Sequence, residues 1–238
     1  MPNSEINREP RPATGGVPAS AGPDAPPLLA DEVANDVRVL DSELMTVGRV
    51  WDLRRDRFAL PGGEELVRDY VDHTGAVAVL AMDDEDRVLL IRQYRHAVGV
   101  RDWEIPAGLM DVAGEPALRG AQRELAEEAD LRASQWHLLL DVMTTPGGSS
   151  EAIRIFLARG LSPVQHDYVR EGEEAEIISR WVPLADAVNA VLSRDIQNAI
   201  TANAVLAAAA SRAGGWSSLG DPNEPWARRS TVRGERSS

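Results

Sequence analysis

The sequence contains no cysteine, which excludes disulfide bonds, zinc sites built on thiolates and cysteine nucleophiles. Basic residues are also few: 25 Lys and Arg stand against 38 Asp and Glu, a formal net charge of -13. So acidic a chain binds nucleic acid or an anionic membrane poorly without specific contacts, because both partners are polyanions. An anionic small-molecule substrate would need local positive charge, from a metal ion or from a few arginines.

Long apolar runs are missing as well. The longest, such as AVLAAAA at 204–210, fall well short of the ~18 residues that indicate a membrane span. The first twenty residues lack the apolar core of a secretory signal, and the chain has no Walker loop, GxGxxG or GxSxG motif. We therefore predict a soluble cytoplasmic protein that binds neither membranes nor nucleic acid.

What is present suggests one enzyme-sized domain with appendages, since 238 residues of 43% apolar composition can bury a sizeable core. Residues 1–35 are rich in Pro, Gly, Ala and Asp, and residues 214–238 are polar and broken by Gly and Pro. Both ends are predicted to be mobile: a disordered N-terminal tail and a flexible C-terminal tail. Residues 36–74 are expected to form an N-terminal strand region, and residues 75–213 are expected to form the main domain.

Short apolar runs predict strands, and they are GAVAVLAMD, RVLLIRQY, DWEIPAG, WHLLLDVM, AIRIFLARG and IISRWV. In the N-terminal region, VGRVWDLRRDRFAL and ELVRDYVDH flank the turn PGG and predict a hairpin. Helical patterns occur at 116–129, 184–193 and 196–212. The sequence thus predicts the α/β class, with a mixed sheet covered by a few helices.

The helix at 116–129 begins at Pro116, which suits a first turn, and ends at Asp130, which tolerates left-handed geometry. At 100° per residue its apolar side chains gather on one side to pack on the sheet: Leu118, Ala121 and Leu125. Roughly a right angle away lies a cluster of like charge: Glu124, Glu127 and Glu128. Gly120 leaves room one turn before Glu124, at a cost to the helix of about 1 kcal/mol relative to alanine.

Two interpretations of this acidic cluster remain open on the residues alone. A solvated charged face is the ordinary one, but such a face usually alternates the sign of its charges. Like charges at positions i and i+4 instead destabilise an isolated helix by a few tenths of a kcal/mol per pair, so a bound cation is expected. Closely spaced carboxylates suit Mg²⁺ or Mn²⁺, which also bind phosphate oxygens, and this favours metal-assisted hydrolysis of a phosphate compound.

The segment from Gly108 to Leu131 resembles the Nudix box, which consists of a Gly, a Glu, then Arg-Glu-x-x-Glu-Glu and a terminal Gly-apolar pair. The interval from Glu115 to Arg123 matches that pattern. Two details depart from it: six residues instead of five separate Gly108 from Glu115, and Asp130 replaces the terminal glycine. Neither removes an ionisable residue of the box.

The resemblance covers most of residues 40–210 and is closest to the ADP-ribose pyrophosphatase branch, whose segment leading into the box is similar to WEIPAGLMDVAGEP. It implies a Nudix-type α/β/α sandwich with a mixed sheet. It also implies a homodimer that exchanges N-terminal strands, here within 36–74. The implied reaction is Mg²⁺-dependent hydrolysis of ADP-ribose to AMP and ribose 5-phosphate, with Mn²⁺ as a possible substitute for Mg²⁺.

By the same resemblance, Glu124 and Glu128 would bind the metal directly, and the carbonyl of Ala107 would complete the protein ligands. Glu127 would either share in binding the metal or contact the residues that bind it. Glu115 would reach the metal through water. Arg123 would orient the carboxylates by charge-assisted hydrogen bonds, although a salt bridge on the helix surface is the simpler alternative.

The catalytic base is sought in the polar segment QHDYVREGEEAEII at 165–178, where the branch carries a loop glutamate. Glu174 is the first choice and Glu173 the second, whereas a merely solvated acidic loop is the alternative. Candidate substrate contacts come from the stretch before the box and from one proline beyond it: Arg92, Arg95, Trp103, Glu104 and Pro146. The tryptophan could equally be packing.

Pro146 lies 15 residues after Leu131, and a downstream proline is a mark of ADP-ribose hydrolases in this family. Taken alone it would be a turn between two strands.

Two further functions stay open, because the box reports the chemistry and only weakly the leaving groups. One is hydrolysis of another nucleoside diphosphate derivative, such as a nucleotide sugar or an oxidised nucleotide. The other is a sensor that binds ADP-ribose without cleaving it, for which a degenerate box would be expected.

Overall fold

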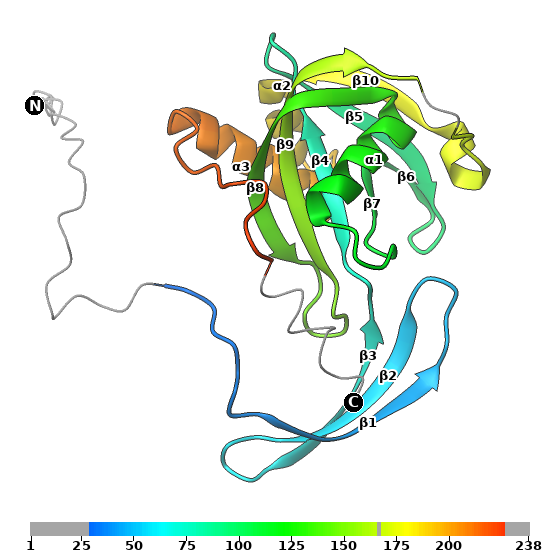
Figure 1. Cartoon of the computed structure of the whole chain (residues 1–238), viewed down its shortest axis with the longest axis vertical. Coiled ribbons are helices and arrows are strands. Elements are labelled where there is room, and N and C mark those ends of the chain that lie inside the picture. Colours follow the sequence, from blue (N-terminus) through cyan, green and yellow to red (C-terminus); the bar gives the residue numbers. More distant parts are fainter. Residues whose placement is uncertain (1–28, 166–167, 227–238) are drawn as a thin grey trace, which may run out of the picture.

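The computed structural model describes residues 29–165 and 168–226, and these form two packed sheets with helices on either side and a third sheet set apart (Figure 1). At the centre is a mixed four-stranded sheet in the order β7-β4-β9-β8. Its strands are β4 (Ala76–Ala81), β7 (Ala107–Leu109), β8 (Leu131–Met143) and β9 (Ala152–Pro163). Strand β4 runs parallel to β9, while the other pairs are antiparallel.

A second, antiparallel sheet has the order β10-β5-β6. Its strands are β5 (Arg87–Arg95), β6 (Val100–Glu104) and β10 (Ile178–Pro183). Strand β5 follows β4 through a short acidic turn, so the two sheets are joined directly in the chain. This turn ends at Asp86, whose φ is 56°, within the left-handed region that Asp tolerates better than most residues.

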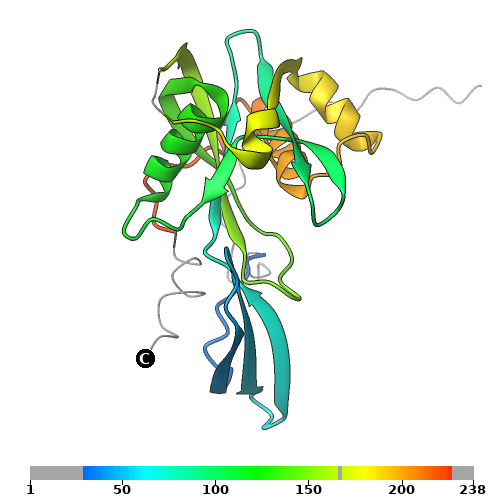
Figure 2. The same ribbon diagram turned by 90° about the vertical axis from the view of Figure 1, so that its right-hand side faces the viewer.

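Helices cover both faces of the sheets. Helix α1 (Ala117–Ala129) lies on one face, and α2 (Leu184–Leu192) and α3 (Ala199–Ala213) lie on the other (Figures 1 and 2). Strand β4 is buried along its whole length, because alternate side chains point into two different cores. Val77 and Val79 pack with Leu125 of α1, whereas Leu80 packs with Val205 of α3. The predicted α/β/α sandwich and its three helices are confirmed.

Burial in these two cores is the main stabilising contribution. Fully burying a side chain such as Leu80 or Phe156, both 0% exposed, contributes about 1.5–3 kcal/mol each. None of the described helices is long and apolar enough to cross a membrane.

The N-terminal region forms a separate three-stranded antiparallel sheet in the order β1-β2-β3, which projects from the rest of the molecule (Figures 1 and 2). Its strands are β1 (Arg38–Thr46), β2 (Asp52–Ala59) and β3 (Glu65–Asp72). The predicted hairpin is β2 and β3, paired from Asp52 with Asp72 to Ala59 with Glu65. Strand β1 was not predicted, because its residues are mostly exposed and lack an apolar alternation.

Residues 214–226, which belong to the tail that the sequence predicts to be flexible, contact the central sheet. Gly220 exchanges two backbone hydrogen bonds with Leu138 of β8, with N···O distances of 2.9 and 3.1 Å. Two tryptophans of this segment stack on arginines of β9: Trp216 on Arg159 and Trp226 on Arg154. The composition of the segment did not predict these contacts, which stabilise its position through cation–π interactions.

The other predicted tail is only partly described. Residues 29–35 contain no helix or strand and are exposed, while residues 1–28 and 227–238 lie outside the described residues.

Candidate active site

Helix α1 carries the acidic cluster and has the ends that its sequence predicts. Pro116 immediately precedes it, and Asp130 follows it with φ 54° and donates its backbone N–H to the carbonyl of Ala126. Glu124 and Glu128 are buried, at 8% and 6% exposed. A solvated charged face is therefore wrong for these two side chains, because they point toward the sheets rather than toward solvent.

Strand β7 holds the two buried carboxylates from the other side. The backbone N–H of Ala107 donates to Glu128 Oε2 at 2.8 Å. A Cβ at position 108 would overlap the carboxyl group of Glu124, so Gly108 is the residue that lets the strand approach so closely. The two glutamates thus lie in a narrow space between α1 and β7.

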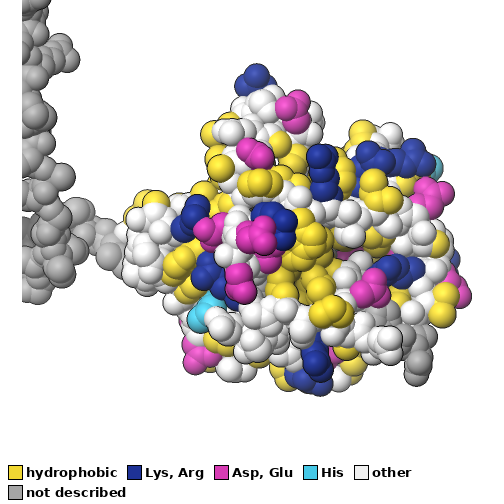
Figure 3. Space-filling model, turned by 90° about the horizontal axis from the view of Figure 1, so that it is seen from above, with side chains coloured by type: hydrophobic (Ala, Val, Ile, Leu, Met, Phe, Trp, Pro, Cys, Tyr) yellow, Lys and Arg dark blue, Asp and Glu magenta, His cyan; other side chains and the backbone are white. Residues whose placement is uncertain are grey.

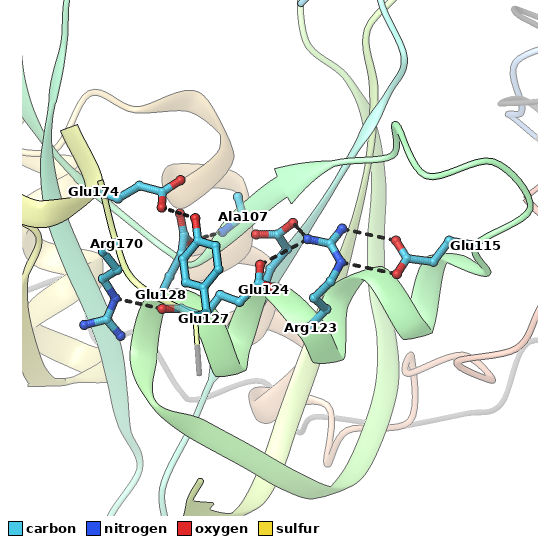
Figure 4. A network of polar contacts seen from close by, with 9 residues as sticks. Ala107, Glu115, Arg123, Glu124, Glu127, Glu128, Arg170 and Glu174 are labelled. Atoms are coloured by element: carbon cyan, nitrogen blue, oxygen red, sulfur yellow. Dashed lines mark hydrogen bonds and ion pairs between the residues drawn. The ribbon is translucent and has the colours of Figure 1, made fainter. Parts of the chain in front are cut away.

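Arg123 connects Glu115, which precedes the helix, with Glu124 and Glu127 of α1 (Figure 4). Its Nε and Nη2 donate to the two oxygens of Glu115 at 3.2 and 3.1 Å. Its Nη1 donates to Glu124 Oε1 at 2.5 Å and to Glu127 Oε2 at 3.2 Å. One guanidinium therefore neutralises part of the charge of three carboxylates, and Glu128 is not one of the three.

The two buried carboxylates, Glu124 and Glu128, lie in an excess of negative charge. Burial raises the pKa of Glu124 to about 7, against the opposing effect of Arg123 and with further increases from Glu127 and Glu174. Burial also raises the pKa of Glu128 to about 8, and the charges of Glu124 and Glu174 add to this increase. Carboxylates that resist ionisation in this way would be stabilised by a cation.

These residues fit a divalent metal ion by their chemistry, because carboxylate oxygens are the ligands that Mg²⁺ and Mn²⁺ prefer. Among the described residues, however, no three His, Asp or Glu side chains already converge on one point that could hold an ion. The Arg123 guanidinium instead lies among the carboxylates. A metal bound here would compete with the arginine for the Glu124 carboxylate.

The loop after β9 brings a further carboxylate to this place. Glu174 lies in a 3-10 helix, η1 (Gly172–Glu176), and its charge raises the pKa values of both buried glutamates of α1. The Tyr168 hydroxyl donates to Glu174 Oε2 at 2.5 Å, which raises the pKa of Tyr168 to about 12. Glu173 is in the same turn, and its side chain lies outside the described residues.

Arg170 is a residue of this site that the sequence did not reveal. Its Nε donates to the carbonyl of Glu127 at 2.7 Å and its Nη2 to Asp130 Oδ2 at 2.8 Å, so it joins the loop to the end of α1 (Figure 4). A signal was present, since Arg170 is the one Lys or Arg in the acidic stretch 165–178.

The candidate substrate residues of β5 and β6 fall on two faces of their sheet. Arg95 Nε and Nη2 donate to both oxygens of Glu104 at 2.7 and 2.6 Å, and the charge of Arg95 lowers the pKa of Glu128. Arg92 lies over the Trp103 ring at 5.4 Å, and this ring packs against the core under α2 and α3. The structure therefore brings Arg95 and Glu104 to the glutamates and places Arg92 and Trp103 on the opposite face.

Pro146 lies elsewhere, in the connection between β8 and β9. It lines a cavity of about 500 Å³ together with residues of the N-terminal sheet, among them Phe58 and Tyr70. No residue of α1 is among the described lining residues of this cavity.

Figure 3 shows acidic and basic side chains next to each other on the upper face of the domain, beside a hydrophobic patch.

The fold and the site together define a class of protein: an α/β/α sandwich whose acidic helix packs against a short strand, with two buried carboxylates between them. The family model described as NUDIX domain matches residues 72–203, and this chain belongs to the Nudix family. Nudix hydrolases act on nucleoside diphosphate derivatives and generally use divalent metal ions.

Two relatives are similar to this chain in sequence, and one solved structure is similar to it in fold. The chain is 45% identical over 173 residues to an ADP-ribose pyrophosphatase of Mycobacterium tuberculosis, covering 73% of this chain and 83% of that protein. It is 36% identical over 169 residues to an ADP-ribose pyrophosphatase of Bacillus subtilis, covering 71% and 90%. A crystal structure of an ADP compounds hydrolase superposes with a TM-score of 0.65 at 21% identity, covering 78% of this chain and 98% of that one, and shares the fold.

Proposed function

We propose that this protein hydrolyses the diphosphate bond of ADP-ribose, with Mg²⁺, to give AMP and ribose 5-phosphate. The observation that carries the proposal is the buried pair Glu124 and Glu128, held between α1 and β7 in a Nudix box that keeps every ionisable position. The relatives named ADP-ribose pyrophosphatase at 45% and 36% identity support the choice of substrate.

The metal would be held by Glu124 and Glu128 directly, with Glu127 shared between the metal and Arg123, the Ala107 carbonyl as a further ligand, and Glu115 acting through water. When bound, Mg²⁺ polarises diphosphate oxygens and lowers the pKa of the attacking water. Mn²⁺ is expected to substitute, since it accepts the same oxygen ligands. Arg123 would keep the carboxylates oriented by its contacts with them.

We assign Glu174 as the general base that accepts a proton from the attacking water, with Glu173 as the alternate. Support comes from the electrostatic effect of Glu174 on both buried glutamates and from the Tyr168 hydroxyl, which holds its carboxylate. A carboxylate next to the metal ligands, but supplied by a separate loop, can move a proton without giving up a ligand.

For the substrate, we assign a diphosphate contact to Arg95, whose side chain is 43% exposed while Glu104 fixes its orientation. Pro146 would meet a more distant part of the substrate, since its cavity also involves the N-terminal sheet. Arg92 and Trp103 lie on the opposite face of their sheet, so the proposed site does not include them.

We also propose a homodimer formed through the N-terminal sheet. This sheet and its β1–β2 connection, which holds Val50 and Trp51, carry a set of large apolar side chains, each 45–50% exposed: Val39, Leu44, Val50, Trp51 and Val67. Apolar side chains gathered on one projecting sheet mark an interaction surface more often than a free one. An exchange of these strands between two copies would cover them.

A substrate panel with product identification tests the reaction. ADP-ribose, a nucleotide sugar and an oxidised nucleoside triphosphate are compared at equal Mg²⁺, and the products are separated by chromatography. We expect the highest kcat/KM for ADP-ribose, with AMP and ribose 5-phosphate formed in equal amounts. A higher kcat/KM for the nucleotide sugar or the oxidised nucleotide would favour that alternative, and tight binding of ADP-ribose without turnover would favour the sensor.

A further inference from the structure

The last residue of the Nudix box differs in this chain, because Asp130 stands where the pattern has a glycine. The backbone requirement for that glycine is still present, since Asp130 has φ 54°. An aspartate in this conformation costs more than a glycine. Its side chain therefore has to be considered as well as its backbone.

The Asp130 carboxylate forms an ion pair with Arg170 at 2.8 Å, and the same guanidinium donates to the Glu127 carbonyl at 2.7 Å. The last carbonyls of a helix have no partner within the helix, so a cation that donates to one of them stabilises the helix end. The backbone N–H of Val164, where β9 ends, donates to the Asp130 carbonyl at 2.9 Å. Both ends of the segment between Val164 and Arg170 are thereby attached to α1.

The attachment at Arg170 lies directly before the turn that carries the proposed base. Only Glu171 separates Arg170 from η1, and the Glu174 backbone N–H donates to the Glu171 carbonyl at 3.1 Å. Tyr168, on the other side of Arg170, donates to the Glu174 carboxylate. The position of Glu174 relative to the glutamates of α1 thus depends on where Arg170 is fixed.

We propose that Asp130 and Arg170 form a latch that positions Glu174 over the carboxylates of α1. This inference rests on the proposed role of Glu174 as general base. A glycine at position 130 would leave Arg170 with the Glu127 carbonyl alone, so the aspartate adds the charged half of the latch. Asp130 and Arg170 are positioning residues, since neither is placed against the substrate.

The test compares Arg170→Ala, Arg170→Lys and Asp130→Gly with the wild-type protein, by steady-state kinetics and by hydrogen–deuterium exchange of the peptide covering 172–177. Asp130→Gly removes the ion pair and leaves the left-handed backbone unstrained. We expect Arg170→Ala to lower kcat roughly 10- to 100-fold, because a misplacement of about 1 Å has effects of that order. KM and the Mg²⁺ activation constant should change less than about twofold, since the metal ligands keep their places.

Smaller losses of kcat are expected for Asp130→Gly, which keeps the contact with the carbonyl, and for Arg170→Lys, which keeps the charge but lacks the forked guanidinium. In all three variants, amides at 172–177 should exchange faster. The matched control is Asp86→Gly, because Asp86 also has positive φ and also pairs with an arginine, Arg212 of α3. That variant should leave kcat and the exchange at 172–177 unchanged.

Two results would overturn the latch. One is unchanged exchange at 172–177 in Arg170→Ala. The other is faster exchange at 172–177 in Arg170→Ala together with an unchanged kcat, provided that Glu174→Gln lowers the kcat of the otherwise wild-type protein. If Glu174→Gln itself leaves kcat unchanged, the proposed base is wrong, and the positioning role falls with it even when the exchange data show that the loop is attached at Arg170.

Discussion

The backbone of Gly108 lies so close to the carboxyl group of Glu124 that a Cβ at position 108 would overlap it. Gly108→Ala should therefore displace Glu124 from the site and lower kcat by about 10- to 100-fold, as expected when a ligand's surroundings are disturbed. Gly62→Ala is the matched control, since nothing lies within 4 Å of its added Cβ. Equal activity of both variants would show that the strand can move away without loss.

Hydrolysis should require added Mg²⁺ or Mn²⁺. Glu128→Gln should lower kcat by at least ~100-fold, because losing a metal ligand costs more than losing a residue that only hydrogen-bonds to a ligand. The fold should stay intact, because glutamine fills the same space and can still accept the hydrogen bond from Ala107. Activity is measured with and without exhaustive chelation, and folding by circular dichroism. Turnover that survives chelation would rule out the metal's role.

The metal-free protein should lose stability as pH rises from about 5 to 8. The pKa of Glu128 is raised from 4.5 to about 8 and that of Glu124 to about 7, so in this range the folded state holds protons that the unfolded chain has released. The free energy of unfolding then falls with pH, by an amount on the order of a few kcal/mol. Asp83, whose pKa is lowered, acts in the opposite direction but below this range.

This pH dependence is measured by urea denaturation at several pH values in the presence of a chelator. The decrease should be shallower in Glu128→Gln, because that variant cannot take up the proton. Saturating Mg²⁺ should restore stability most at the upper end of the range. Identical slopes for the variant and the wild type would contradict the assignment of this effect to Glu128.

Glu174→Gln should lower kcat by ~10²- to 10⁴-fold, the usual contribution of a general base, with KM and metal affinity nearly unchanged. Glu173→Gln serves as the neighbouring control and should have a much smaller effect. Steady-state kinetics measures kcat and KM, and Mn²⁺ titration measures the metal affinity separately. Weak and equal effects of both changes would leave a metal-bound hydroxide, formed without a loop carboxylate, as the better account.

The protein should sediment as a dimer at micromolar concentration, because the N-terminal sheet exposes Trp51 and Val67 at 48% and 50%. Trp51→Glu should shift the equilibrium toward monomer, since it places a charge on the apolar surface. Analytical ultracentrifugation measures both proteins. A wild-type protein that is only monomeric at this concentration would count against the dimer.

Local sequence determined much of the fold. The alternation of apolar residues predicted the strands, and the helix at 116–129 was predicted almost to its limits because Pro116 and Asp130 mark its ends through their own backbone preferences. Strand β1 was missed because it is exposed and carries no apolar pattern. The contacts of the C-terminal segment could not be predicted, because composition alone does not show that Trp216 has a partner in Arg159, many residues earlier.

The clustering of Glu124, Glu127 and Glu128 could be predicted from the sequence, because their spacing on a helix depends only on helix geometry. Which glutamates are buried, and which arginine faces them, was decided only by the tertiary structure. Arg92 and Arg95 are three residues apart, yet strand alternation places them on opposite faces of the sheet. Arg170 meets Asp130 across 40 positions of the chain, and only packing of β9 beside α1 brings such residues together.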